Sequence, residues 1–318
     1  MKIMAILQKI GWWFKGVFSN LLYRIRPRLT FRWIFSFVVW LLVIAYIGFG
    51  VYFGFKIYKY KSEDKATKFA VKIYPLPAAT VNSSVIWAKD YYQQLNYIRQ
   101  FSSKTKQSFP DEKTIRQQIT EQLIENKLLE NQARKYRIKV TSKDVDDAYK
   151  KIVDQSGGTS EVKKVLNELY GMTEKDFKVL VKQQVLKEKI QNEVIAQVKV
   201  AHILIKDEGR AKEIADRVKK GENFGDLAKQ FSEDTKSRDA GGELGWLAKG
   251  QLVIDNNTIP EFDNAAFAAK KGEIVGPVKT NIGFEIILVE DKKGQVEESF
   301  NDWLNNLKKQ AKIWRFIQ

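Results

Sequence analysis

His202 is the only histidine in this chain of 318 residues, and the chain has no cysteine. It lies in VKVAHILI at 198–205, where apolar residues alternate as they do in a strand. An imidazole changes charge near neutral pH and can transfer a proton or orient polar neighbours, although a lone histidine on a strand is often structural. The lack of cysteine excludes a thiol nucleophile, thiolate metal ligands, disulfides and a lipid-modified cysteine anchor.

The segment around His202 has the pattern of a compact α+β unit. After the strand, apolar residues at i, i+3, i+4 and i+7 predict a helix that ends at Gly221. Three further stretches follow: glycine-rich AGGELGWLAKGQ at 240–251, helical PEFDNAAFAAKKG at 260–272, and GPVKTNIGFEIILVE at 276–290, which reads as two strands and a turn. We therefore predict four strands and about four helices within 197–293.

The preceding region, 80–196, is predicted to be mainly helical. Thr141 with Asp144 and Thr173 with Asp176 have the spacing of carboxylate capping boxes at two helix starts. The predicted apolar helix faces consist of Ile115, Ile119, Leu123, Ile124 and Leu128; Val145, Ala148, Tyr149 and Ile152; and Phe177, Leu180, Val181 and Val185. These spacings indicate packing between helices and do not point to a cofactor.

The last segment, 294–318, carries a strong apolar stripe at helical spacing. Its members are Phe300, Trp303, Leu304, Leu307, Ala311 and Trp314. A stripe this rich must pack on another element, and we expect the helical region to receive it.

Residues 33–55, WIFSFVVWLLVIAYIGFGVYFGF, contain no charged side chain. At about 1.5 Å per residue, such a helix crosses a hydrocarbon layer of about 30 Å. A cleaved signal peptide normally has a shorter apolar region and a small-residue cleavage site, whereas a lysine-rich stretch follows here. The sequence predicts a single transmembrane helix at 33–55 that places the chain in a lipid bilayer, and a spacer at 56–79.

The net charge of +16 is concentrated near this apolar segment. Residues 1–76 hold thirteen Lys and Arg against Glu63 and Asp64, so +11 of the total lies there. This distribution favours anionic lipid head groups over nucleic acid as the partner of the basic residues. Apolar residues from Ile3 to Phe18 at helical spacing predict an amphipathic interfacial helix within 1–32. Within about 20 residues of the span, five basic residues precede it and six follow it, so charge alone does not orient the helix.

Six blocks between 201 and 289 resemble the parvulin-type peptidyl-prolyl cis-trans isomerases of the PpiC type. They are AHILI (201–205), ENFGDLAKQFSED (222–234), GGELGW (241–246), AAF (265–267), GEIVGPVKT (272–280) and GFEIILV (283–289). The resemblance implies a parvulin domain at 197–293 with a four-stranded antiparallel sheet flanked by about four helices. It also implies a site for proline-containing polypeptides that uses neither a cofactor nor a metal.

The helical region is similar to the N-terminal chaperone domain of the SurA and PrsA type. The similar stretches are TVN (80–82), LLENQARKYRIKVTSKDVDDAY (128–149) and GMTEKDFKVLVKQQVLKEKI (171–190). This similarity implies a domain at 80–196 that holds unfolded clients, with a C-terminal helix at 294–318 that packs back onto it. A membrane anchor ahead of such a pair resembles the PpiD arrangement. That arrangement implies a cytoplasmic N-terminus and extracytoplasmic residues 56–318.

The parvulin resemblance also suggests site residues. The polar, catalytic set consists of His202, Asp234, Thr280 and Glu285, and the proline pocket consists of Leu252, Phe262 and Phe267. Other interpretations remain open, because Asp234 could cap a helix after Ser232 and the apolar residues could be ordinary core.

Two features depart from the family pattern. Glu285 stands where parvulins usually have a second histidine, and 253–259 contains an insertion after Leu252. A carboxylate at 285 could accept a hydrogen bond from His202 and raise the pKa of His202, or it could place an unwanted charge beside the substrate. The sequence thus leaves two hypotheses, an active membrane-anchored foldase and a holdase whose parvulin domain only binds peptide.

Overall fold

The computed structural model describes residues 31–107, 111–254 and 257–317. The predicted amphipathic helix between Ile3 and Phe18 lies outside these residues. Contacts between Cα atoms divide the chain into two compact units, up to Leu76 and from Pro77 onward.

The first unit contains helix α2 (Phe31–Tyr58), whose segment Phe35–Tyr58 is long and apolar enough to cross a membrane, with a mean hydropathy of 2.2. The predicted spacer is not unstructured, because it contains helix α3 (Lys65–Ile73). Asp64 caps α3 by accepting a hydrogen bond from the Thr67 backbone N–H, and α3 folds back against α2. Tyr74 then lies over Tyr46, with ring centroids 4.7 Å apart.

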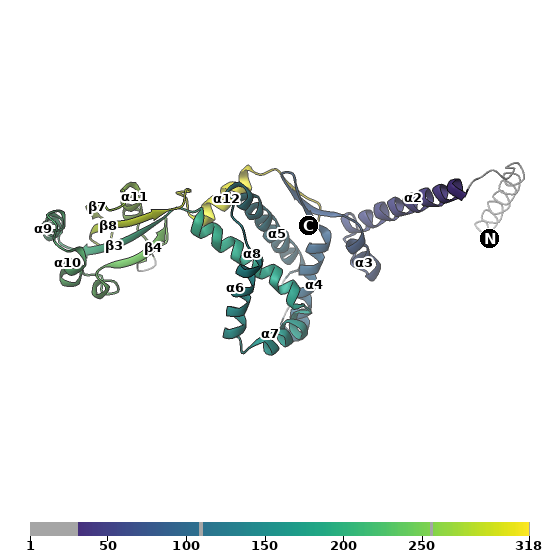
Figure 1. Cartoon of the computed structure of the whole chain (residues 1–318), viewed down its shortest axis with the longest axis horizontal. Coiled ribbons are helices and arrows are strands. Elements are labelled where there is room, and N and C mark those ends of the chain that lie inside the picture. Colours follow the sequence, from purple (N-terminus) through teal and green to yellow (C-terminus); the bar gives the residue numbers. More distant parts are fainter. Residues whose placement is uncertain (1–30, 108–110, 255–256, 318) are drawn as a thin grey trace, which may run out of the picture. The chain divides into compact units, whose positions relative to one another are not determined.

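The second unit begins with a hairpin and a set of helices (Figure 1). The elements are β1 (Pro77–Val81), β2 (Ser84–Trp87), α4 (Ala88–Thr105), α5 (Glu112–Lys135), α6 (Ser142–Gln155), α7 (Thr159–Val165), a π-helical turn (Leu166–Tyr170) and α8 (Glu174–Glu193). Both predicted capping boxes are confirmed, at Thr141 with Asp144 and at Thr173 with Asp176. The interior faces follow the predicted periodicity, since Ile115, Ile119, Ile124 and Leu128 are all buried.

The C-terminal segment differs from its prediction. Helix α12 ends at Gln310 (Phe300–Gln310) because Ala311 is extended, so Ala311 and Trp314 do not continue the helical stripe. The chain instead forms strand β9 (Ile313–Arg315), which pairs antiparallel with β1 and leaves the Trp314 side chain 58% exposed. Helix α12 packs on α5, where the Lys308 ammonium lies 3.1 Å from the Glu121 carboxylate and 3.0 Å from that of Glu125.

A four-stranded antiparallel sheet in the order β4-β3-β8-β7 occupies the middle of the second unit's sequence. Its strands are β3 (Gln197–Ile205), β4 (Glu243–Ala248), β7 (Ile274–Lys279) and β8 (Phe284–Lys293). Its helices are α9 (Glu208–Lys219), α10 (Phe224–Phe231) and α11 (Pro260–Ala268), with a 3₁₀ turn at Arg238–Ala240. The predicted α+β class and antiparallel sheet are confirmed.

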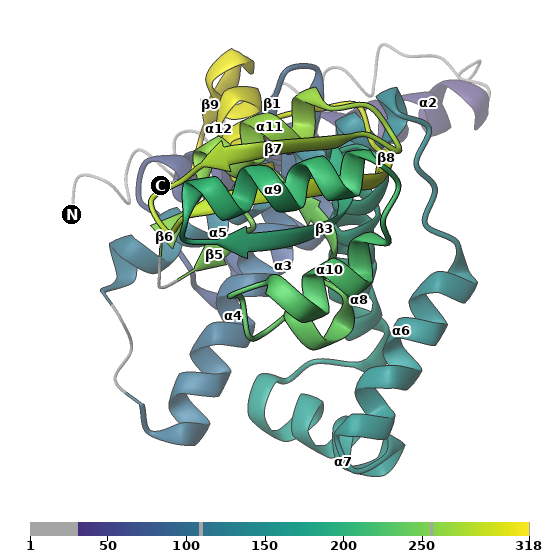
Figure 2. The same ribbon diagram turned by 90° about the vertical axis from the view of Figure 1, so that its left-hand side faces the viewer.

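Helices cover both faces of this sheet. Helix α9 lies across β7 and β3 on one face, beside α10, as Figure 2 shows. Helix α11 packs on the other face, where Phe262, Phe267 and Leu252 form a buried cluster with Ile287 and Val289. The insertion that the sequence placed at 253–259 contains a short hairpin, β5 (Val253–Ile254) and β6 (Asn257–Thr258).

Candidate active site

The regular alternation of strand β3 determines which way His202 points. Val198 and Val200 face the α11 side of the sheet, whereas Ala201, Ile203 and Ile205 face α9 and α10. This alternation is not interrupted by the register shift between Val200 and Ala201 against β4. Because side chains alternate along a strand, His202 points toward the α11 face like Val198 and Val200, on the side of Phe262.

Strand β8 places Glu285 on this same face. Glu285 pairs with Leu204 across the β3–β8 ladder, two residues from His202 along β3. The Nδ1 atom of His202 lies 2.8 Å from Oε2 of Glu285, and both side chains have zero solvent exposure. Residues separated by 83 positions in the sequence thus form a buried pair on one sheet face.

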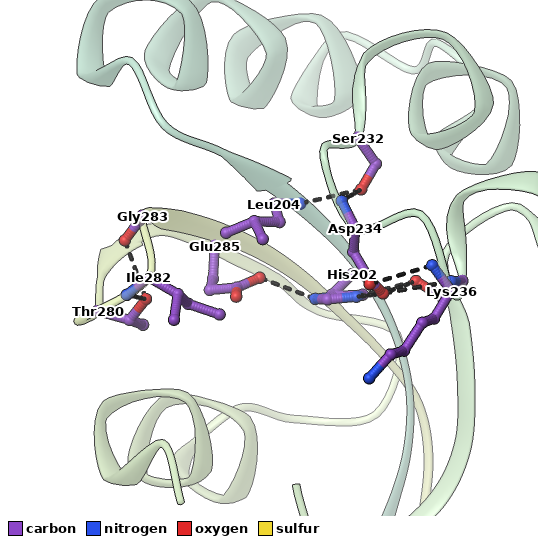
Figure 3. Close-up of polar contacts among 10 residues, drawn as sticks. His202, Leu204, Ser232, Asp234, Lys236, Thr280, Ile282, Gly283 and Glu285 are labelled. Atoms are coloured by element: carbon purple, nitrogen blue, oxygen red, sulfur yellow. Dashed lines mark hydrogen bonds and ion pairs between the residues drawn. The ribbon is translucent and has the colours of Figure 1, made fainter. Parts of the chain in front are cut away.

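The second imidazole nitrogen completes a polar network, drawn in Figure 3. The Nε2 atom of His202 lies 3.0 Å from Oδ2 of Asp234 and 3.0 Å from Oγ of Ser237. The Ser237 hydroxyl also donates a hydrogen bond of 2.5 Å to the same Asp234 oxygen. Ser237 was not predicted from sequence, and the only signal for it is its position three residues after Asp234, where an aspartate side chain can hold a turn.

The loop after α10 fixes Asp234 in place. Its carboxylate accepts hydrogen bonds from the backbone N–H groups of Lys236 and Ser237, and the Ser232 hydroxyl oxygen accepts from the N–H groups of Leu204 and Asp234. Asp234 therefore organises a turn and contacts the imidazole at the same time. Burial would raise its pKa, but the hydrogen bonds from Ser237 and His202 outweigh burial and lower it.

The electrostatics of His202 favour an imidazolium. Burial is the largest influence and lowers the pKa of His202, but the hydrogen bonds and charges of Glu285 and Asp234 together raise that pKa above its ordinary value of 6.5. An imidazolium donates from both nitrogens, which matches a carboxylate on each side. The first of the two outcomes considered for Glu285, a raised pKa of His202, is the one that this geometry favours.

This raised pKa predicts a pH-dependent stability. A group whose pKa is higher in the folded state stabilises the fold fully below its unfolded pKa, and the contribution is lost as pH rises through the folded pKa. We expect the free energy of unfolding of the sheet region to fall as pH rises from about 6.5. Urea unfolding followed by hydrogen exchange of β3 and β8 amides at several pH values measures this. Because the chain has no other histidine, a His202→Leu/Glu285→Leu double variant should abolish this fall of the unfolding free energy with pH. The same pH dependence in the double variant would show that it does not come from His202.

The predicted proline-pocket residues all lie in the cluster beneath α11. Leu252, Phe262 and Phe267 are 8%, 1% and 6% exposed. The Phe262 ring meets the His202 ring edge to face, with centroids 6.1 Å apart and an interplanar angle of 82°. The Phe262 cluster and the polar network therefore adjoin each other. Leu252, Phe262 and Phe267 are also part of the hydrophobic core beside the sheet.

Thr280 lies apart from this network. Its hydroxyl, in the turn between β7 and β8, donates to the Gly283 carbonyl at 3.0 Å and accepts from the Ile282 N–H at 3.4 Å. Within the described residues no hydrogen bond joins Thr280 to His202, Asp234 or Glu285 (Figure 3). The structure thus shows Thr280 as a turn residue and leaves a contact with substrate as a prediction.

Comparisons with known proteins match two parts of this chain. Residues 180–293 match the PPIC-type PPIase domain, and residues 22–191 match the SurA-like N-terminal domain. Foldase protein PrsA 3 of Bacillus cereus is 31% identical over 197 residues, which are 61% of this chain and 66% of that protein, just under two thirds of its length. Foldase protein PrsA of Clostridium botulinum is 31% identical over 276 residues, 74% of this chain and 80% of that protein. Among solved structures, the peptidylprolyl isomerase PrsA of Bacillus anthracis has 31% identity, covers 59% of this chain and 84% of its own, and gives a TM-score of 0.31.

An antiparallel sheet with a buried histidine network, together with these two matches, defines a chain that joins a PPIC-type PPIase domain to a SurA-like domain. The chain belongs to the PrsA foldase family. The parvulin and SurA-like resemblances drawn from the sequence are confirmed.

Proposed function

We propose that this chain is a membrane-anchored extracytoplasmic foldase that isomerises X-Pro bonds in unfolded polypeptides. The observation that carries the proposal is the His202 network beside the Phe262 cluster on one face of the sheet. The helix at Phe35–Tyr58 supports a single membrane span. The resemblance to membrane-anchored folding factors supports a cytoplasmic N-terminal segment and extracytoplasmic residues 56–318. We propose 80–196 as the chaperone domain, 197–293 as the isomerase domain and 294–318 as a C-terminal segment that packs on the chaperone domain.

The reaction requires no covalent step. Rotation about an X-Pro bond meets a barrier of about 18–20 kcal/mol that comes from amide resonance. A site accelerates rotation when it holds the proline ring against apolar side chains and binds the twisted amide better than the planar one. Leu252 and Phe267, the more exposed members of the Phe262 cluster, supply the apolar contact for the ring, and the polar network supplies the groups near the carbonyl.

The burial of the network assigns different tasks to its members. The His202 side chain has no exposed surface, so it does not reach a bound peptide. The Asp234 side chain is 14% exposed and is the member nearest to solvent. We therefore propose His202 and Glu285 as positioning residues that hold Asp234 and Ser237, without proton transfer to the substrate.

A peptide-binding holdase is the second candidate. The specific observation in its favour is that Leu252, Phe262 and Phe267 pack closely as core, with Glu285 in place of the usual second histidine. A holdase would bind unfolded chains through the same surfaces without lowering the barrier to proline rotation.

One refolding experiment separates the two candidates. The full chain in neutral lipid nanodiscs is added to a test protein whose slow refolding phase is limited by one cis proline, and the slow rate and the aggregated fraction are both measured. A foldase raises the slow rate at substoichiometric amounts and lowers aggregation. Lower aggregation at an unchanged slow rate would show a holdase, and no effect on either would remove both functions.

A further inference from the structure

The small sheet of the second unit has a free edge beside a cleft. Its strand order is β2-β1-β9, so β2 is an edge strand. Within the described residues, the backbone groups of Ser84, Val85 and Ile86 form no hydrogen bond outside the β1–β2 hairpin. An edge strand directs every other N–H and C=O away from its neighbour, where they can pair with another extended chain.

The cleft next to this edge has a volume of about 330 Å³ and is bordered by α4, α5 and α8. Three consecutive residues of β2, Val85, Ile86 and Trp87, line it. The cleft therefore borders β2 over three of the four residues of this strand. A strand added to the free edge of β2 would border this cleft.

The cleft carries a negative charge that is not neutralised. Asp90, Glu130 and Asp176 line it together with the single cation Lys127. Lys127 pairs with Glu130 at 2.6 Å, and Asp176 caps α8 while accepting a hydrogen bond from Gln93. In the described part of the chain the Asp90 carboxylate has neither a hydrogen-bond nor an ion-pair partner, and burial, the largest influence, raises its pKa above 3.8.

We propose that the free edge of β2 binds an extended segment of unfolded polypeptide as an added strand, with a Lys or Arg side chain of that segment at Asp90. Main-chain hydrogen bonds to the edge give binding with little sequence preference, and alternate side chains enter the cleft. The inference rests on the proposed function, because it names where and how the helical region would hold a client.

The test uses the full chain in neutral lipid nanodiscs and proline-free, ten-residue peptides that carry a fluorescent label. One peptide alternates valine with lysine, and a second alternates valine with glutamine. Two further versions of the lysine peptide are N-methylated, one at odd positions and one at even positions. Only one of these two N-methylated peptides should lose binding, by more than about tenfold, because alternate N–H groups face the partner in a β-ladder.

The Asp90→Asn variant tests the charge. Fluorescence anisotropy should show affinity for the lysine peptide reduced about 3- to 10-fold, with the glutamine peptide unchanged, as expected for loss of one partly buried ion pair. Asp226→Asn is the control, because Asp226 is also an aspartate in the first turn of a helix and lies outside the cleft. Bound peptide should also slow hydrogen exchange in β2.

The possible outcomes are distinct. Equal binding of the two N-methylated peptides, or equal effects of Asp90→Asn and Asp226→Asn, would overturn the β2 site even if peptides bind and refolding is accelerated. Affinity that depends on protein concentration, with β2 of one chain crosslinked to another chain, would make the occupant a second copy and would also overturn the proposal. Failure of every peptide to bind, together with no effect on refolding, would instead indicate failure of the proposed function.

Discussion

Replacing His202 with alanine is expected to lower the free energy of unfolding of the sheet region by about 3–5 kcal/mol, the usual cost of removing one partner from a buried ion pair. The substitution leaves Glu285 fully buried and without the 2.8 Å contact to Nδ1. Its other oxygen, Oε1, already has no hydrogen-bond partner among the described residues, so nothing in place compensates. Urea unfolding monitored by hydrogen exchange of β3 and β8 measures the loss.

The double variant His202→Leu/Glu285→Leu is the control for this prediction. It removes both charges and replaces them with apolar groups of similar volume, a change that is often neutral in buried pairs. Most of the lost stability should therefore return, while Asp234 and Ser237 lose their imidazole partner. A His202→Ala variant within about 1 kcal/mol of the original chain would contradict the ion-pair account of this site.

Gly242→Ala is expected to destabilise the site, because Gly242 lies against the backbone of His202. Gly242 has φ +81°, and a Cβ built on it would lie 2.2 Å from the carbonyl oxygen of His202. The Gly242 carbonyl also accepts a 2.8 Å hydrogen bond from the His202 N–H, so the neighbouring strand cannot shift without loss of that bond. A left-handed penalty of about 1–2 kcal/mol and overpacking of about 1–3 kcal/mol combine to a loss near 3 kcal/mol.

Gly221→Ala separates these two contributions. Gly221 also has a positive φ, of +98°, but a Cβ there would meet open space. This variant should show only the conformational penalty of about 1–2 kcal/mol in the same unfolding measurement. Equal losses for Gly242→Ala and Gly221→Ala would mean that the close approach to His202 contributes nothing.

Local chemistry explains which parts of the fold could be predicted. The capping box at Thr141 and Asp144 and the strand that contains His202 depend on residues that are close in sequence. Both could therefore be predicted from one sequence. The parvulin resemblance suggested His202, Asp234 and Glu285 as one set, and the structure brings these three side chains into hydrogen-bond contact.

Other features depend on contacts that have no local signal. Strand β9 is three residues long, too short for periodicity, and its partner β1 lies at the other end of the second unit. Ser237 joins the network through a turn that Asp234 organises, and a serine in a polar loop gives no indication of that role. Thr280 was suggested by resemblance alone, and in the structure its hydroxyl holds its own turn.

The central claim is that the His202 network lies in a working isomerase site. Exchange NMR of an X-Pro peptide, with the full chain in neutral lipid nanodiscs at catalytic amounts, measures the cis/trans exchange rate directly. We predict exchange well above the rate with empty nanodiscs, with strong reduction in His202→Ala under conditions where that variant remains folded. Normal peptide binding with exchange at the uncatalysed rate would contradict the account and would leave the holdase in its place.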